Sequence, residues 1–212
     1  MSPTAASARH ILCMKWGTKY GPEYVNRLYA MVRRHLSGDF RFVCLTDDST
    51  GIRSEVPVDA PLADWQRVWE REMRVNFLAA VDLTRAAILH FRRHGGGRIV
   101  NMASRAGQRG YASKAMSYGA SKAALINLTK SVAQSHGHEG ITAVALAPGW
   151  VRTEMAEAFI ARHGEAAALA GIPIGAMAAP EEIGELVAFT FRPSQASLNG
   201  AVLDVNGGSY LR

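Results

Sequence analysis

The sequence has few cysteines and no long apolar run, and both absences narrow the class of protein. Its 212 residues contain two cysteines, Cys13 and Cys44, which lie in apolar, strand-like segments. This placement favours reduced, buried thiols over a disulfide framework. No apolar stretch is long enough to span a bilayer, and residues 1–9 lack the apolar middle of a secretory signal. We therefore predict a cytoplasmic protein with no membrane partner.

Metal-ligand spacing and a basic stripe are also missing. The histidines near the expected helix ends, His94, His136, His138 and His163, are better suited to surface or capping roles than to a metal site. The net charge of +6 is spread along the chain rather than gathered on one segment, so no nucleic-acid partner is expected. The length suits one core, and we predict a single domain over 1–212.

The first sixty residues read as a strand, a helix and a strand. Residues 10–16 form an apolar run, Pro22 opens an amphipathic helix over 22–36, and residues 40–45 form a second apolar run. This order predicts a βαβ unit over 10–54. The glycine- and proline-punctuated residues 51–61 are interpreted as a junction.

The remaining chain alternates long helical patterns with short apolar runs. We predict helices over 63–93 and 115–136, shorter helical pieces over 154–178 and another helix from Pro180. Strands are expected over 98–103, 141–147 and 201–205. The small and β-branched residues of 141–147 are typical of a parallel sheet covered on both faces. An apolar stripe on the first helix consists of Trp65, Trp69, Met73, Ala80, Leu83, Ala87 and Phe91, interrupted by the lone polar Asn76.

A tyrosine and a lysine one helical turn apart carry the clearest chemical signal. Tyr118 and Lys122 stand at i and i+4 and project from one helix face, with Ser104 fourteen residues upstream of the tyrosine. The phenol of a free tyrosine titrates near about 10, and a neighbouring ammonium favours its ionised form. The pair therefore suits a proton relay to a substrate oxygen. An exposed helix pair without function is the alternative, because such spacings also arise by chance.

Five motifs in order resemble the short-chain dehydrogenase/reductase family from about Val58 to the end of the chain. They are Arg74-Val-Asn-Phe77, Gly97-Arg-Ile-Val-Asn-Met-Ala-Ser104, Tyr118-Gly-Ala-Ser-Lys122, Pro148-Gly-Trp-Val-Arg-Thr153 and Asp204-Val-Asn-Gly-Gly208. The resemblance implies a catalytic part over 58–212, with a Rossmann-like parallel sheet. It also implies an Asn-Ser-Tyr-Lys set at Asn76, Ser104, Tyr118 and Lys122. Asn76 is either a structural tie or, as the resemblance implies, the holder of a relay water near Lys122.

The same resemblance implies NAD or NADP as the cofactor. Tyr118 and Lys122 would hold the nicotinamide ribose, and Pro148 and Val151 would lie against the nicotinamide in the segment that contains Gly149. Thr153 would approach the pyrophosphate. The implied substrate is a small-molecule carbonyl or secondary alcohol, and the implied partner is a second copy of the chain in a dimer or tetramer.

The sequence also departs from this family. The Gly-rich turn of the form T-G-x-x-x-G-x-G, which brings backbone N–H groups to the cofactor phosphates, is absent. We therefore expect an α/β fold whose N-terminal half is truncated or replaced, with about five strands. The replacing segment resembles the start of a bacterial glycosyltransferase around residues 13–22 and 44–48. Asp47 and Asp48 then either contact a ribose or a nucleotide-bound metal, or simply form the turn after a strand.

These patterns leave three hypotheses for function. The first is an NAD(P)-dependent oxidoreductase in which strand 10–16 docks beside strand 98–103 and Lys19 meets a phosphate. The second is a catalytically silent family member that acts only in assembly, which the missing Gly-rich turn favours. The third is a nucleotide-sugar-binding or glycosyl-transfer role for residues 10–48, and the lack of an acceptor domain counts against it.

Overall fold

The computed structural model describes residues 9–15, 21–36, 39–46, 50, 52, 58–59, 63–111 and 115–211. The chain divides into two compact units, Met1–Arg67 and Val68–Arg212. Each is described by itself, and the single domain expected over 1–212 and the docking of strand 10–16 stay predictions. Lys19, Asp47 and Asp48 lie outside the described residues.

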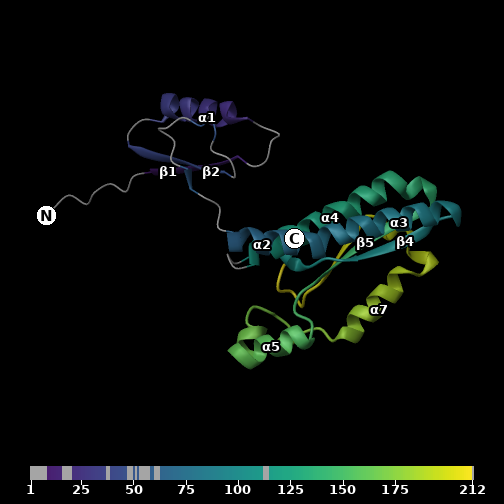
Figure 1. The fold of residues 1–212 in the computed structure, drawn as a ribbon. Helices are drawn as coiled ribbons and strands as arrows, with labels where there is room; N and C mark the ends of the chain where they lie inside the picture. Colours follow the sequence, from purple (N-terminus) through teal and green to yellow (C-terminus); the bar gives the residue numbers. More distant parts are fainter. Residues whose placement is uncertain are drawn as a thin grey trace. The chain divides into compact units, whose positions relative to one another are not determined.

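The first unit contains the predicted strand, helix and strand. Strand β1 (Arg9–Lys15) pairs in parallel with β2 (Phe40–Thr46), and helix α1 (Pro22–His35) connects them (Figure 1). Val25, Tyr29 and Val32 of α1 pack against the sheet, where the Tyr29 and Phe42 rings meet edge to face with centroids 5.3 Å apart. The helical spacing of these apolar residues thus forms the face that covers the sheet.

Both cysteines lie in this first sheet and are free thiols. Cys13 stands opposite Cys44 in the register of β1 and β2. Cys44 is fully buried, and Cys13 is partly buried. Burial, together with the hydrogen bond to Cys44, raises the pKa of the Cys13 thiol to about 12. A thiol held in its protonated form is a poor nucleophile. Both cysteines thus match the prediction of buried thiols.

The structure adds one short strand to those predicted from the sequence. The junction over 51–61 contains a two-residue strand, β3 (Val58–Asp59), which pairs in parallel with β2. The six described strands, against the about five expected, form two three-stranded sheets, β1-β2-β3 and β4-β5-β6. A strand of two residues has no periodicity of its own, so only its pairing with β2 reveals it.

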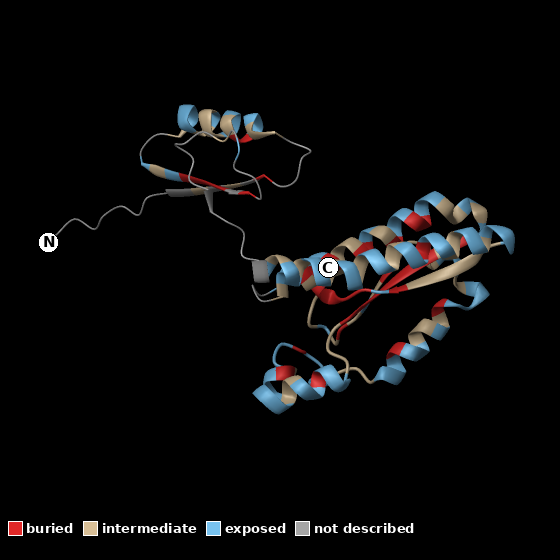
Figure 2. Cartoon of the chain, viewed as in Figure 1, coloured by how far each residue is buried: buried red, intermediate tan, exposed pale blue. Residues whose placement is uncertain are grey.

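The second unit is built on the parallel sheet of β4 (Gly97–Met102), β5 (Ile141–Pro148) and β6 (Val202–Val205). Successive residues of the central strand β5 face opposite sides. Ala145 and Ala147 pack with Ile126 of helix α4 (Met116–His136), and Val144 and Leu146 pack with Ile183 of helix α7 (Pro180–Thr190). Figure 2 shows β5 buried between these two layers. The fold is the predicted α/β parallel sheet with helices on both faces.

The predicted helix over 63–93 is continuous but not uniform. It consists of α2 (Ala63–Met73), a π-helical turn (Arg74–Leu78) and α3 (Ala79–Arg93). The π turn contains one more residue than an α turn and rotates the face that follows. Thr84 is therefore the buried residue of α3, and Leu83, which the apolar stripe predicted to be buried, is 72% exposed.

Shorter helices complete the second unit. Helices α5 (Glu154–His163) and α6 (Glu165–Leu169) match the pieces predicted over 154–178. Turns of 3-10 helix lie at Arg105–Gly107, Gly137–Glu139 and Pro193–Leu198. No helix in the described ranges is long and apolar enough to cross a membrane, and no cluster of metal-ligating side chains occurs among the same residues.

Candidate functional site

Ser104 lies just after the carboxyl end of β4, where polar side chains of a parallel sheet collect. It is 8% exposed, and its Oγ accepts a hydrogen bond from the Ala106 N–H at 3.1 Å. This bond caps the 3-10 turn Arg105–Gly107. Because the hydroxyl accepts here, its own hydrogen remains to be donated to a ligand oxygen.

Gly107 brings the Ser104 turn against helix α4. A Cβ at this position would lie 2.6 Å from the backbone N of Ala123 and 2.6 Å from the backbone C of Lys122. Those atoms belong to the helix and cannot move aside as a flexible side chain would. The glycine therefore permits the close approach that places Ser104 near the Tyr118–Lys122 helix.

We expect Gly107→Ala to overpack this contact and to lower the free energy of unfolding by about 1–3 kcal/mol. Urea denaturation measures the effect. Gly110→Ala is the matched control, because a Cβ there meets nothing within 4 Å. Equal stability of the two variants would contradict the proposed role of Gly107.

Tyr118 and Lys122 meet on one face of α4 as predicted. The Lys122 Nζ lies 5.7 Å from the centroid of the Tyr118 ring and donates a hydrogen bond to the Met102 carbonyl at 2.9 Å. Burial lowers the pKa of Lys122, and the charge of Glu72 opposes that shift. The lysine thus links α4 to the end of β4, two residues before Ser104. This Lys122–Met102 hydrogen bond joins the segment that leads to Ser104 with the helix that contains Tyr118.

Tyr111, another tyrosine between Ser104 and Lys122 in the sequence, packs against Tyr118. Their rings meet edge to face with centroids 6.4 Å apart. Tyr111 has Ala115 at i+4, so it lacks the lysine that accompanies Tyr118. The cation beside Tyr111 is Arg109, whose Cζ lies 6.0 Å from the ring centroid, whereas Tyr118 has the lysine of its own helix.

Asn76 lies in the π-helical turn and is partly buried. Its Nδ2 donates to Glu72 Oε2 at 2.5 Å. The asparagine thus has a hydrogen-bond partner, as a polar group on an apolar stripe requires. Sequence analysis did not single out Glu72, although its position four residues before Asn76 on a helix was a usable signal.

The segment after β5 contains the other predicted cofactor residues. The Gly149 N–H donates to the Val205 carbonyl at 2.9 Å, and a Cβ on Gly149 would lie 3.0 Å from Asn206 Cα. Gly149 thus allows close packing of β5 on the end of β6. Pro148 is buried at the end of β5, and the exposed Thr153 donates through Oγ1 to the Val151 carbonyl at 3.3 Å.

Val151 forms an isolated parallel bridge with Ala178. The bridge uses the Trp150 carbonyl, 3.1 Å from the Ala178 N–H, and the Arg152 N–H, 2.9 Å from the Ala178 carbonyl. In such a bridge the N–H of the central residue points to the opposite side. The Val151 N–H is therefore directed away from Ala178, as a backbone contact with a ligand amide requires.

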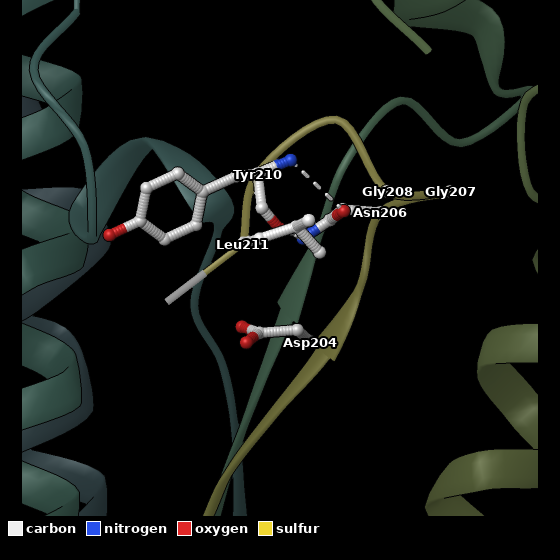
Figure 3. Close-up of a pocket in the computed structure, with 6 residues that line it drawn as sticks. All are labelled: Asp204, Asn206, Gly207, Gly208, Tyr210 and Leu211. Atoms are coloured by element: carbon white, nitrogen blue, oxygen red, sulfur yellow. Dashed lines mark hydrogen bonds between the residues drawn. The ribbon is translucent and has the colours of Figure 1, made fainter. Parts of the chain in front are cut away.

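An open pocket of about 590 Å³ lies at the end of β6. Its lining, drawn in Figure 3, consists of Asp204, Asn206, Gly207, Gly208, Tyr210 and Leu211. The Asn206 Oδ1 accepts a hydrogen bond from the Tyr210 N–H, which stabilises the turn after β6. The Tyr210 hydroxyl donates to the Gln108 carbonyl at 3.2 Å. None of the predicted catalytic residues lines this pocket, but the Tyr210 bond ties it to the loop that follows Ser104.

A parallel α/β sheet with polar side chains beyond the carboxyl ends of its strands is typical of Rossmann-like folds. Residues 44–210 match the sequence model of a family described as enoyl-(acyl carrier protein) reductase. The chain belongs to the short-chain dehydrogenase/reductase family. The match begins at Cys44, fourteen residues before the start of the predicted resemblance, and includes the second of the two segments that suggested a glycosyltransferase.

Curated relatives share about a third of their residues with the chain. A 3-oxoacyl-(acyl-carrier-protein) reductase of Vibrio cholerae serotype O1 is 36% identical over 143 residues, which cover 68% of this chain and 58% of the relative. An acetoacetyl-CoA reductase of Rhizobium meliloti is 32% identical, covering 67% and 58%. The chain thus spans less than two thirds of the length of these relatives.

Solved structures share the fold. A 4-hydroxyisoleucine dehydrogenase complexed with NADH superposes with a TM-score of 0.63 at 18% identity, covering 94% of this chain and 98% of the other. A variant of actinorhodin polyketide ketoreductase with NADPH gives a TM-score of 0.63 at 26% identity, covering 89% and 73%. The fold prediction is confirmed, and both neighbours hold a nicotinamide dinucleotide.

Proposed function

We propose that the chain is an NAD(P)-dependent oxidoreductase that interconverts a carbonyl and a secondary alcohol. The observation that carries this proposal is the position of the Lys122 ammonium. It donates a hydrogen bond to the Met102 carbonyl and lies beside the Tyr118 ring. Both Lys122 and Tyr118 belong to helix α4, against which Gly107 allows the Ser104 turn to pack. A cation beside a phenol and a hydroxyl donor is the arrangement that proton transfer to a substrate oxygen needs.

In the reducing direction, Tyr118 donates its phenolic proton to the carbonyl oxygen. Ser104 donates a hydrogen bond to the same oxygen and orients it. The Lys122 ammonium stabilises the negative charge left on the Tyr118 oxygen. Asn76 connects the lysine to solvent, from which the proton is replaced. In the oxidising direction the same groups remove the alcohol proton.

The residues present fit the nicotinamide half of the cofactor. The Val151 N–H faces away from its own bridge, and Lys122 supplies a cationic donor next to Tyr118. Pro148, Gly149 and Thr153 flank that N–H along the chain, and Tyr118 and Lys122 would hold the ribose. When bound, the cofactor supplies or accepts the hydride. Both NADH and NADPH are candidates, because the sequence contains no Gly-rich turn of the form T-G-x-x-x-G-x-G.

Titration of the purified protein with NADH and NADPH, followed by nicotinamide fluorescence, tests the proposal. We expect saturable binding of one cofactor and its oxidation by small-molecule carbonyl compounds such as 3-oxoacyl thioesters. Absence of saturation at millimolar concentrations of either cofactor would overturn the oxidoreductase proposal.

A second role, self-assembly, is favoured by exposed apolar side chains on the long helix. Val75 and Leu78 of the π turn are 63% and 48% exposed, and Leu83 of α3 is 72% exposed. Large apolar side chains gathered along one helix are typical of protein–protein contacts. A second copy of this chain is the proposed partner, in a dimer or tetramer.

We expect Leu83→Asp to reduce the mass measured by sedimentation velocity toward that of the monomer, because a carboxylate in an apolar interface is costly to desolvate. Met155→Asp on α5 is the control, since Met155 is equally exposed at 77% but lies on another helix. A monomeric parent protein, or an unchanged mass for Leu83→Asp, would contradict assembly through this helix.

A further inference from the structure

Glu72 is the one acidic side chain whose charge acts on Lys122 in the described part of the chain. It also accepts the 2.5 Å hydrogen bond from Asn76 Nδ2. It thus contacts one residue of the Asn-Ser-Tyr-Lys set directly and influences a second. None of the five motifs that indicate the family includes this position.

The hydrogen bond determines how the Asn76 amide is oriented. A carboxylate only accepts hydrogen bonds, so Asn76 must present its NH₂ group to Glu72. The amide oxygen, Oδ1, is then directed away from Glu72. In this orientation Oδ1 is available to accept a hydrogen bond from a water molecule of the relay.

Glu72 and Asn76 lie on either side of the junction between α2 and the π-helical turn. Glu72 belongs to the last turn of α2, and Asn76 lies in the middle of the π turn, which packs against α4. Helix α4 carries Lys122. Single π turns inside α-helices occur frequently at functional sites. The carboxylate and the amide therefore lie on the helix that packs against the one carrying the ammonium.

The charge of Glu72 has a consequence for Lys122. Burial lowers the pKa of Lys122, and the Glu72 carboxylate raises it again. The other groups that face the lysine are Tyr118 on its own helix and the Met102 carbonyl of β4. No ion pair of Lys122 occurs within the described ranges, so the ammonium depends on Glu72 for a compensating negative charge.

We propose that Glu72 is a positioning residue of the proton relay, which orients the Asn76 amide and keeps Lys122 in its ammonium form. The proposal rests on the proposed oxidoreductase function of the same site. It gives Glu72 an indirect role, since the carboxylate touches Asn76 and not the reacting atoms. A simple Glu–Asn pair at i and i+4 on a helix surface would stabilise the helix slightly and leave Lys122 unaffected.

Direct titration of Lys122 tests the proposal without any catalytic reaction. The chain has only five lysines, so reductive methylation with ¹³C-formaldehyde gives a simple NMR spectrum, in which Lys122→Arg identifies the Lys122 signal. We expect Glu72→Gln to move the titration midpoint of Lys122 to lower pH, because the variant keeps the side-chain volume and a hydrogen-bond acceptor but removes the charge. Glu72→Asp should restore the midpoint toward that of the parent protein.

Asp82→Asn is the matched control, because it removes one exposed negative charge from the same continuous helix. We expect it to leave the Lys122 midpoint unchanged. An unchanged midpoint in Glu72→Gln, or an equal shift in both variants, would overturn the proposal.

The pH dependence of catalytic activity provides a second test of the role of Glu72. We expect Glu72→Gln to lower kcat/KM roughly tenfold, with the loss growing as pH rises, because the deprotonated fraction of Lys122 grows with pH. A loss that is uniform across the pH range would indicate a structural role and overturn the proposal. If the parent protein lacks oxidoreductase activity, the proposed function fails, and the NMR titration still decides the role of Glu72.

Discussion

Replacing Tyr118 with phenylalanine should reduce kcat by about a thousandfold, a much larger loss than the few-fold weakening of cofactor binding expected from one lost ribose contact. The variant removes one oxygen atom and the only proton that the proposed reaction transfers from the tyrosine. General acid–base groups contribute about 10²–10⁴-fold to a rate, which sets the expected size. The Tyr118 ring stays, so its edge-to-face contact with Tyr111 and its position beside Lys122 are retained.

The measurement is a comparison of kcat with the dissociation constant of the cofactor for each variant. Tyr111→Phe is the control, since it removes the same atom from the neighbouring ring and should leave kcat within a few-fold of the parent value. A Tyr118→Phe variant that retains full activity would exclude Tyr118 as the proton donor. The same loss in both variants would point to packing rather than proton transfer.

Replacing Lys122 with alanine should weaken cofactor binding and catalysis together. The ammonium stabilises charge on the Tyr118 oxygen, and by family resemblance it also holds the nicotinamide ribose. We expect a loss of about a hundredfold or more in kcat/KM, because one group takes part in both binding and the reaction. The variant also removes the hydrogen bond to the Met102 carbonyl, so its thermal stability must be measured alongside.

Lys130→Ala is the matched control for this experiment. Lys130 lies on the same helix, eight residues further along, and is exposed. We expect its cofactor affinity and kcat/KM to equal those of the parent protein. If Lys122→Ala binds the cofactor as tightly as Lys130→Ala does, Lys122 does not hold the ribose, and its role is restricted to Tyr118.

Much of the secondary structure could be predicted from local patterns. Pro22 and the apolar spacing of Val25, Tyr29 and Val32 predict α1, and the structure confirms it from Pro22 to His35. The run of small and β-branched residues at 141–147 predicts the central strand, and β5 spans Ile141–Pro148. These patterns are local, because each follows from the side-chain periodicity within a single helix or strand.

Other features depended on contacts between elements. The π turn at Arg74–Leu78 has the same residue types as an α-helix, and it moved burial from Leu83 to Thr84. The strand β3 exists only because β2 lies beside it. The influence of Glu72 on Lys122 requires the π turn to pack against α4, and no spacing along the chain shows that packing.

The sequence by itself indicated the family and the α/β class, because the order and spacing of motifs along the chain carry that information. The same motifs supply the proposed set of Asn76, Ser104, Tyr118 and Lys122. Only the tertiary structure showed how Gly107 seats the Ser104 turn on α4, which carbonyl holds Lys122, and which way the Val151 N–H points. Each of these is a contact between residues far apart in the chain. Such contacts are determined by how helices and strands pack, and a pattern within one element does not contain that packing.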